Sequence, residues 1–127
     1  MHTVLIDDDS TSIFLMQMLL KREAFAEEVT AFQSAEEALQ FLQQAPPQQR
    51  PQVILLDLNM PVMNGWEFLE ALSPTAEELL PHCRIYILTS SLAHTDMARA
   101  ADNPLVTRLL HKPLDKAALQ RILAEVA

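Results

Sequence analysis

The sequence predicts an α/β domain in which a parallel sheet of five strands is covered by helices on both faces. Three short aliphatic runs without polar alternation, residues 3–6, 53–58 and 85–89, are typical of strands buried on both sides. Two weaker strand candidates span residues 29–32 and 105–110. Segments with helical periodicity lie between these runs, and this alternation favours parallel pairing through helical crossovers.

Helices in the first half of the chain are indicated by apolar residues three and four positions apart. Residues 11–22 carry such a stripe, and Ser10 or Thr11 is its expected N-cap. Ser34 with Glu37 three residues later forms the signature of a capping box before the second helix.

Helices in the second half are expected at residues 65–72, at about 94–102 and after Asp115, which can cap the last one. Residues 76–80 are expected to add a helical turn within a long connection.

Composition narrows the classes of function. The chain has 127 residues, 50% of them hydrophobic, which suits one domain spanning 1–127. A formal net charge of −8 without a basic patch argues against direct nucleic-acid binding, and no apolar run is long enough for a membrane span. One glycine, Gly65, excludes the glycine-rich phosphate loops, and a single cysteine, Cys83, favours a reducing cytoplasmic setting.

Carboxylates follow two of the predicted strands. Asp57 ends the run 53–56, while Asp7 and Asp8 follow directly after residues 3–6. The carboxyl ends of parallel strands share one edge of a sheet, so these side chains should form an acidic pocket. Carboxylates at close range favour a hard divalent cation such as Mg²⁺, and one of them can act as a nucleophile toward phosphorus.

Two further residues suit phosphoryl chemistry. Lys112 follows the last predicted strand and could neutralise charge on a phosphoryl group. Thr89 ends the fourth predicted strand and could donate a hydrogen bond to a phosphoryl oxygen.

These residues lie in four segments that together resemble the receiver domain of two-component response regulators, of the stand-alone, chemotaxis-regulator-like type. The segments are Leu5-Ile6-Asp7-Asp8-Asp9, Leu55 to Gly65, Leu88-Thr89-Ser90 and Lys112-Pro113. The resemblance covers essentially the whole chain. It implies a flavodoxin-like, doubly wound (βα)5 fold with strand order 2-1-3-4-5 and the site at the switch point.

The resemblance also implies a role for each acidic residue. Asp57 would be the phospho-acceptor and a metal ligand, and Asp8 would bind the metal directly. Asp7 would help to hold the ion through water, and the backbone carbonyl of Asn59 would complete the protein ligands. The implied cofactor is Mg²⁺, with Mn²⁺ as a possible substitute.

Four more positions take roles from the resemblance. Lys112 would pair with the phosphoryl group, Thr89 or Ser90 would be the switch hydroxyl, and Pro113 would follow a cis peptide bond. Leu109 stands where many receivers have an aromatic residue that rotates inward, which puts that form of readout in doubt.

The function implied is a cytoplasmic, bacterial phosphorelay switch rather than a classical enzyme. A histidine kinase or histidine phosphotransfer protein would supply the phosphoryl group, and the domain would catalyse its own phosphorylation and dephosphorylation. Phosphorylation would change the surface around helix 94–102, the last strand and the last helix, where a downstream protein would bind. The chain is expected to act alone, as a monomer or a phosphorylation-linked dimer, without nucleic-acid or membrane partners.

Two other functions use the same acidic residues. A Mg²⁺-dependent phosphohydrolase with an aspartyl nucleophile would need a general acid where this chain has Asn59. An interaction module with a degenerate, unphosphorylated pocket would not need Lys112 beside the complete set of acids.

Overall fold

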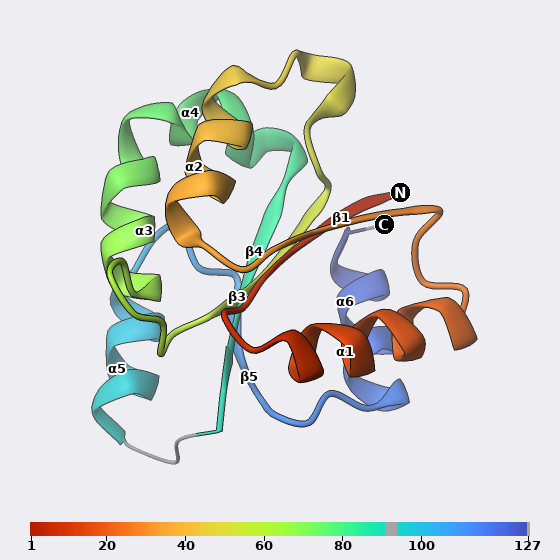
Figure 1. Ribbon diagram of the computed structural model, residues 1–127. Coiled ribbons are helices and arrows are strands. Elements are labelled where there is room, and N and C mark those ends of the chain that lie inside the picture. The colour runs from red at the N-terminus through yellow and green to blue at the C-terminus, as the bar shows by residue number, and fades with distance from the viewer. Residues whose placement is uncertain (91–93, 127) are drawn as a thin grey trace.

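The computed structural model describes residues 1–90 and 94–126, and its centre is one parallel sheet (Figure 1). The strands lie in the order β2-β1-β3-β4-β5, and every neighbouring pair is parallel, which confirms the expected topology. They are β1 (His2–Ile6), β2 (Glu28–Phe32), β3 (Val53–Asp57), β4 (Arg84–Thr89) and β5 (Arg108–His111).

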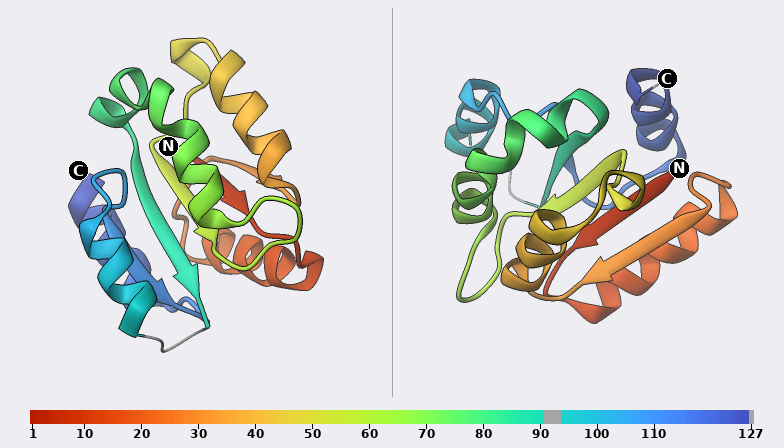
Figure 2. Two further views of the ribbon diagram at one scale, coloured as in Figure 1. Left: turned by 90° about the vertical axis from the view of Figure 1, so that its left-hand side faces the viewer. Right: turned by 90° about the horizontal axis from the view of Figure 1, so that it is seen from above.

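Helices cover both faces of this sheet, as Figure 2 shows most clearly in its right-hand view. On one face lie α1 (Ser10–Arg22) and α6 (Lys116–Val126), and on the other lie α2 (Ala35–Gln44), α3 (Gly65–Leu72) and α5 (His94–Asp102). The short α4 (Ala76–Leu79) confirms the extra turn expected before β4. The doubly wound architecture inferred from the sequence is therefore correct.

Two hydrophobic cores lie on opposite sides of the sheet. Along β3, Ile54 and Leu56 pack with α2 and α3, whereas Val53 and Leu55 pack with α1 and α6. All four side chains are fully buried. Successive side chains of a strand point to opposite faces, so a strand covered on both sides must be apolar at every position. This requirement explains the unbroken apolar run before Asp57.

Caps show where the helices begin. Asp115 caps α6 by accepting a hydrogen bond from the Ala118 N–H at 2.8 Å, as predicted. The prediction for α1 is wrong, because Asp9 is its N-cap and accepts from the Thr11 N–H at 2.9 Å. Asp9 has extended backbone angles, whereas Ser10 already belongs to the helix.

The last strand is shorter than the sequence indicated. β5 begins at Arg108 rather than at residue 105. The Asn103 side chain accepts a hydrogen bond from the Leu105 N–H at 2.9 Å, and its carbonyl accepts one from the Val106 N–H at 3.1 Å. These bonds form a turn that occupies the start of the apolar run.

Candidate functional site

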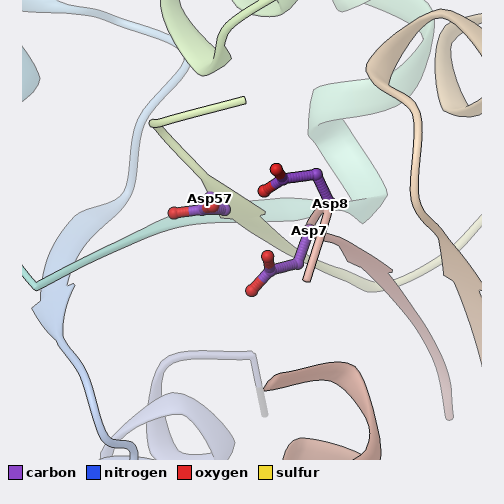
Figure 3. Close-up of side chains that lie close together, drawn as sticks. All are labelled: Asp7, Asp8 and Asp57. Carbon is purple, nitrogen blue, oxygen red and sulfur yellow. The ribbon is translucent and has the colours of Figure 1, made fainter. Parts of the chain in front are cut away.

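Three aspartates from two adjacent strands meet at the carboxyl edge of the sheet. Asp7 and Asp8 follow β1, and Asp57 is the last residue of β3, which pairs with β1 in parallel. Figure 3 shows their side chains gathered beside these strand ends, and one oxygen of each carboxylate lies within 4.8 Å of the others. Asp7 and Asp57 are buried, whereas Asp8 is exposed to solvent. The predicted acidic pocket is present.

Lys112 extends from the end of β5 into this pocket. Its Nζ lies 2.7 Å from Asp7 Oδ2 and 3.5 Å from Asp57 Oδ1. The Lys112 N–H also donates to the carbonyl of Thr89 at 2.8 Å, which ties the start of the loop to β4. The peptide bond between Lys112 and Pro113 is cis, the isomer that the family resemblance implied. Residues far apart in sequence therefore form one compact cluster of charges.

Burial and neighbouring charges shift the pKa values of this cluster. Burial raises the pKa of Asp57 to about 6, and the charge of Asp7 adds to the rise while Lys112 opposes it. For Asp7, burial acts upward, but hydrogen bonds from Lys112, the Asp9 N–H and Ser12 outweigh it and lower the pKa. The pKa of Lys112 is raised, because its interactions with Asp7 and Asp57 outweigh its own burial.

The donor set fits a divalent cation. All three candidate ligands are carboxylate oxygens, which Mg²⁺ prefers, and the exposed Asp8 leaves one side of the pocket open to water. Three carboxylates face a single ammonium group, so the cluster keeps excess negative charge when all of its members are ionised. The Asn59 N–H hydrogen bonds to Asp57 and helps to lower the pKa of that carboxyl group. Asn59 therefore lies next to the acids, as expected for a residue whose carbonyl could join them.

The two candidate switch hydroxyls differ in burial. Thr89 ends β4 and is 1% exposed, whereas Ser90 is exposed and follows the strand. β4 is the neighbour of β3, with Leu88 opposite Asp57, so Thr89 lies just beyond the phospho-acceptor candidate along the sheet edge.

Gly65 allows a close approach that sequence reasoning did not identify. A Cβ atom at this position would lie 2.9 Å from the Asp57 carbonyl oxygen, closer than real Cβ contacts allow. The Gly65 N–H donates to the Leu58 carbonyl at 3.0 Å, and Asn64 with Glu67 forms a capping box that starts α3. The loop after Asp57 is thus folded back onto the end of β3. The Asn-x-x-Glu spacing was the sequence signal for this cap.

A family model for the response regulator receiver domain matches residues 3–124. The chain belongs to this family. Receiver domains are signalling switches rather than classical enzymes, bind Mg²⁺ at an acidic pocket and interact in general with histidine kinases or phosphotransfer proteins.

Solved structures and a curated relative agree with this assignment. A response regulator receiver protein from Dyadobacter fermentans is 30% identical with a TM-score of 0.88, and the match covers 98% of this chain and 96% of the other. The chemotaxis protein CheY4 from Vibrio cholerae is 26% identical with a TM-score of 0.79, covering 99% and 98%. The probable methanogenesis regulatory protein FilR2 from Methanothrix harundinacea is 26% identical over 97% of this chain and 79% of its own length.

Leu109 stands at the position where the family resemblance implied an aromatic residue. Leu109 occupies that position on β5 and packs, partly buried, against the core that contains α2, α3 and α5. Within residues 1–90 and 94–126, no helix is both long and apolar enough to cross a membrane.

Proposed function

We propose that this receiver domain is a phospho-acceptor switch that takes a phosphoryl group onto Asp57 from a histidine kinase or histidine phosphotransfer protein. The observation that supports this proposal best is the convergence of Asp57, Asp7, Asp8 and Lys112 at one strand edge. Asp57 supplies a nucleophilic carboxylate, and Lys112 supplies a fixed positive charge within a few ångströms of it.

In the transfer step, a carboxylate oxygen of Asp57 attacks phosphorus and forms a new P–O bond. The P–N bond of the phosphohistidine breaks, and the imidazole leaves with the bonding electrons and takes up a proton. To end the signal, a water oxygen attacks phosphorus and the P–O bond to Asp57 breaks. The Asp57 carboxylate is restored with the bonding electrons, and the protons of the water leave with inorganic phosphate or pass to solvent. A pKa of about 6 leaves Asp57 ionised at neutral pH and more basic than an ordinary aspartate.

The proposed direct ligands of Mg²⁺ are Asp8, Asp57 and the carbonyl of Asn59. Asp7 is proposed to act through water. Mn²⁺ has the same preference for oxygen ligands. Held by these residues, the ion would supply positive charge to orient the phosphoryl oxygens and to stabilise charge that develops on them. Lys112, whose Nζ lies 3.5 Å from Asp57 Oδ1, would bind a phosphoryl oxygen once Asp57 is modified.

Thr89 is our choice for the switch hydroxyl over Ser90, because its burial beside β3 suits an inward hydrogen bond. Contact of Thr89 with the phosphoryl group would favour one of two states of the surface formed by α5, β5 and α6. A downstream protein is proposed to bind to this surface. The domain is proposed to act as a monomer or as a phosphorylation-linked dimer. Bacterial origin, cytoplasmic location and a single domain over 1–127 stay predictions.

Intact mass spectrometry after incubation with Mg²⁺ and acetyl phosphate tests the proposal. One phosphoryl adduct should form, should require Mg²⁺, and should be absent in Asp57→Asn. Asp102→Asn, which removes an exposed carboxylate on α5, is the matched control and should still gain the adduct. Absence of an adduct and failure to bind Mg²⁺–beryllofluoride would contradict the proposal. Beryllofluoride binding without an adduct would instead indicate rapid hydrolysis of the acyl phosphate.

A further inference from the structure

Ser12 on the first turn of α1 contacts the charged cluster, although no sequence motif pointed to it. Its Oγ accepts a hydrogen bond from Lys112 Nζ at 3.4 Å. The Ser12 side chain also helps to lower the pKa of the nearby Asp7 carboxyl group. Within the described residues, the Lys112 ammonium group thus contacts the neutral Ser12 hydroxyl as well as the carboxylates of Asp7 and Asp57.

The position of this hydroxyl is well defined by its surroundings. Asp9 caps α1, and the Asp9 N–H donates to Asp7 Oδ1 at 3.0 Å, so the helix start and the Asp7 carboxylate are joined. Asp7 Oδ2 then accepts from Lys112 at 2.7 Å. Ser12 Oγ is a second acceptor for the same ammonium group, at 3.4 Å.

The rest of the environment of Ser12 is mainly apolar. Ser12 and Lys112 line a cavity of about 430 Å³ beside the site, with the polar residues Asp9, Thr11 and Ser90 and an apolar wall from α1 and the segment after β5: Leu15, Met16, Leu19, Pro113 and Leu114. A hydroxyl group on such a wall gains most from a specific partner. An ammonium group that lost the hydroxyl would face this cavity with one fewer acceptor.

We propose that Ser12 is a positioning residue that holds the Lys112 ammonium group within reach of a phosphoryl group on Asp57; this inference rests on the proposed function. Asp7 is also a proposed metal-site residue, so its attraction for Lys112 weakens when its charge is shared with a cation. The neutral oxygen of Ser12 keeps its hydrogen bond to Lys112 under those conditions. Lys112 therefore remains oriented when transfer to Asp57 takes place.

The test compares initial rates of phosphorylation by acetyl phosphate in the presence of Mg²⁺, followed by intact mass. Ser12→Ala should slow the reaction by about three- to tenfold, the range expected when one ordinary hydrogen bond is lost. Ser12→Thr keeps the hydroxyl group and should restore the rate to within about twofold of the wild type. Thr11→Ala, which removes the neighbouring hydroxyl on the same turn, is the matched control and should react like the wild type.

Two further measurements separate positioning from a structural role. Ser12→Ala should weaken binding of Mg²⁺–beryllofluoride, read from the fluorescence of the single tryptophan, Trp66. In a Lys112→Ala background, Ser12→Ala should have no further effect on the rate. The inference is overturned if Ser12→Ala matches the wild type, if Ser12→Thr is equally slow, or if the effect persists without Lys112. A wild-type protein that neither gains a phosphoryl group nor binds Mg²⁺–beryllofluoride would refute the proposed function instead.

Discussion

Replacing Asp57 by asparagine should stabilise the metal-free protein at neutral pH. The Asp57 carboxyl group is only 7% exposed, and burial raises its pKa from 3.8 to about 6. Ionisation of Asp57 is therefore less favourable in the folded protein than in the unfolded chain, and this difference lowers the free energy of unfolding at neutral pH. Asparagine has nearly the same shape and carries no charge, so it removes this cost.

The magnitude follows from the pKa shift. A rise of about two pKa units corresponds to about 3 kcal/mol, because each unit is worth about 1.4 kcal/mol. The buried amide loses part of this gain if it is incompletely hydrogen bonded, so we expect a net stabilisation of about 1–3 kcal/mol. For a chain of this length, that raises the melting temperature by about 4–10 °C.

The pH dependence has a definite sign. The pKa of Asp57 is higher in the folded state, so protonation of Asp57 stabilises the wild type below about pH 4, and this contribution is lost as the pH rises through about 6. The advantage of the asparagine variant should therefore grow between these values and stay constant above them. The pKa of Asp7 is shifted downward, so its own titration falls below this window in the wild type.

Urea and thermal unfolding in EDTA from pH 4 to 8 would measure this difference, with Asp102→Asn as the exposed control. Equal stability of wild type and Asp57→Asn at pH 7.5, or a gain that does not vary with pH, would refute the reasoning. Saturating Mg²⁺ should offset this advantage, since a ligand at one hundred times its Kd stabilises the protein that binds it by about 2.7 kcal/mol.

Three further substitutions probe the surroundings of the site. Gly65→Ala should lower the free energy of unfolding by about 1–3 kcal/mol, because its methyl group collides with the backbone at the end of β3; unchanged urea unfolding would argue against that contact. Arg99→Ala should alter the emission of Trp66, because the guanidinium carbon lies 4.6 Å from the ring centroid, while stability falls by about 1 kcal/mol or less. Lys112→Ala should raise the pKa of Asp57 above 6, because it removes the positive charge that opposes the rise. An NMR titration of the Asp57 carboxyl carbon measures this pKa, and an unchanged value would contradict the prediction.

The strands and the acids of the site could be predicted from sequence because they depend on short-range patterns. A strand buried on both faces is apolar at every position, so residues 53–56 identify β3 without knowledge of its neighbours. Asp7, Asp8 and Asp57 follow such runs, and parallel pairing places their ends at one edge. Family resemblance added the strand order, which periodicity alone does not contain.

The choice between competing helix caps and turns was harder to predict from the sequence. Asp9, Ser10 and Thr11 are all good N-caps, and the choice of Asp9 depends on where the backbone leaves β1. Similarly, Asn103 forms a turn within an apolar run that could equally have continued the strand toward Arg108. These alternatives differ by small energies that the surrounding packing decides.

By itself the sequence determined the identity of the chemical groups: which acids end the strands, and that a lysine follows the last one. Only the tertiary structure decided that Lys112 lies closer to Asp7 than to Asp57, that Ser12 contacts Lys112, and that Gly65 packs on the end of β3. The physical reason is that hydrogen bonds and charge interactions depend on distances of a few ångströms between residues as far apart as 105 positions in the chain. Those distances are set by the packing of α1 and β5 around the sheet, which no local pattern specifies.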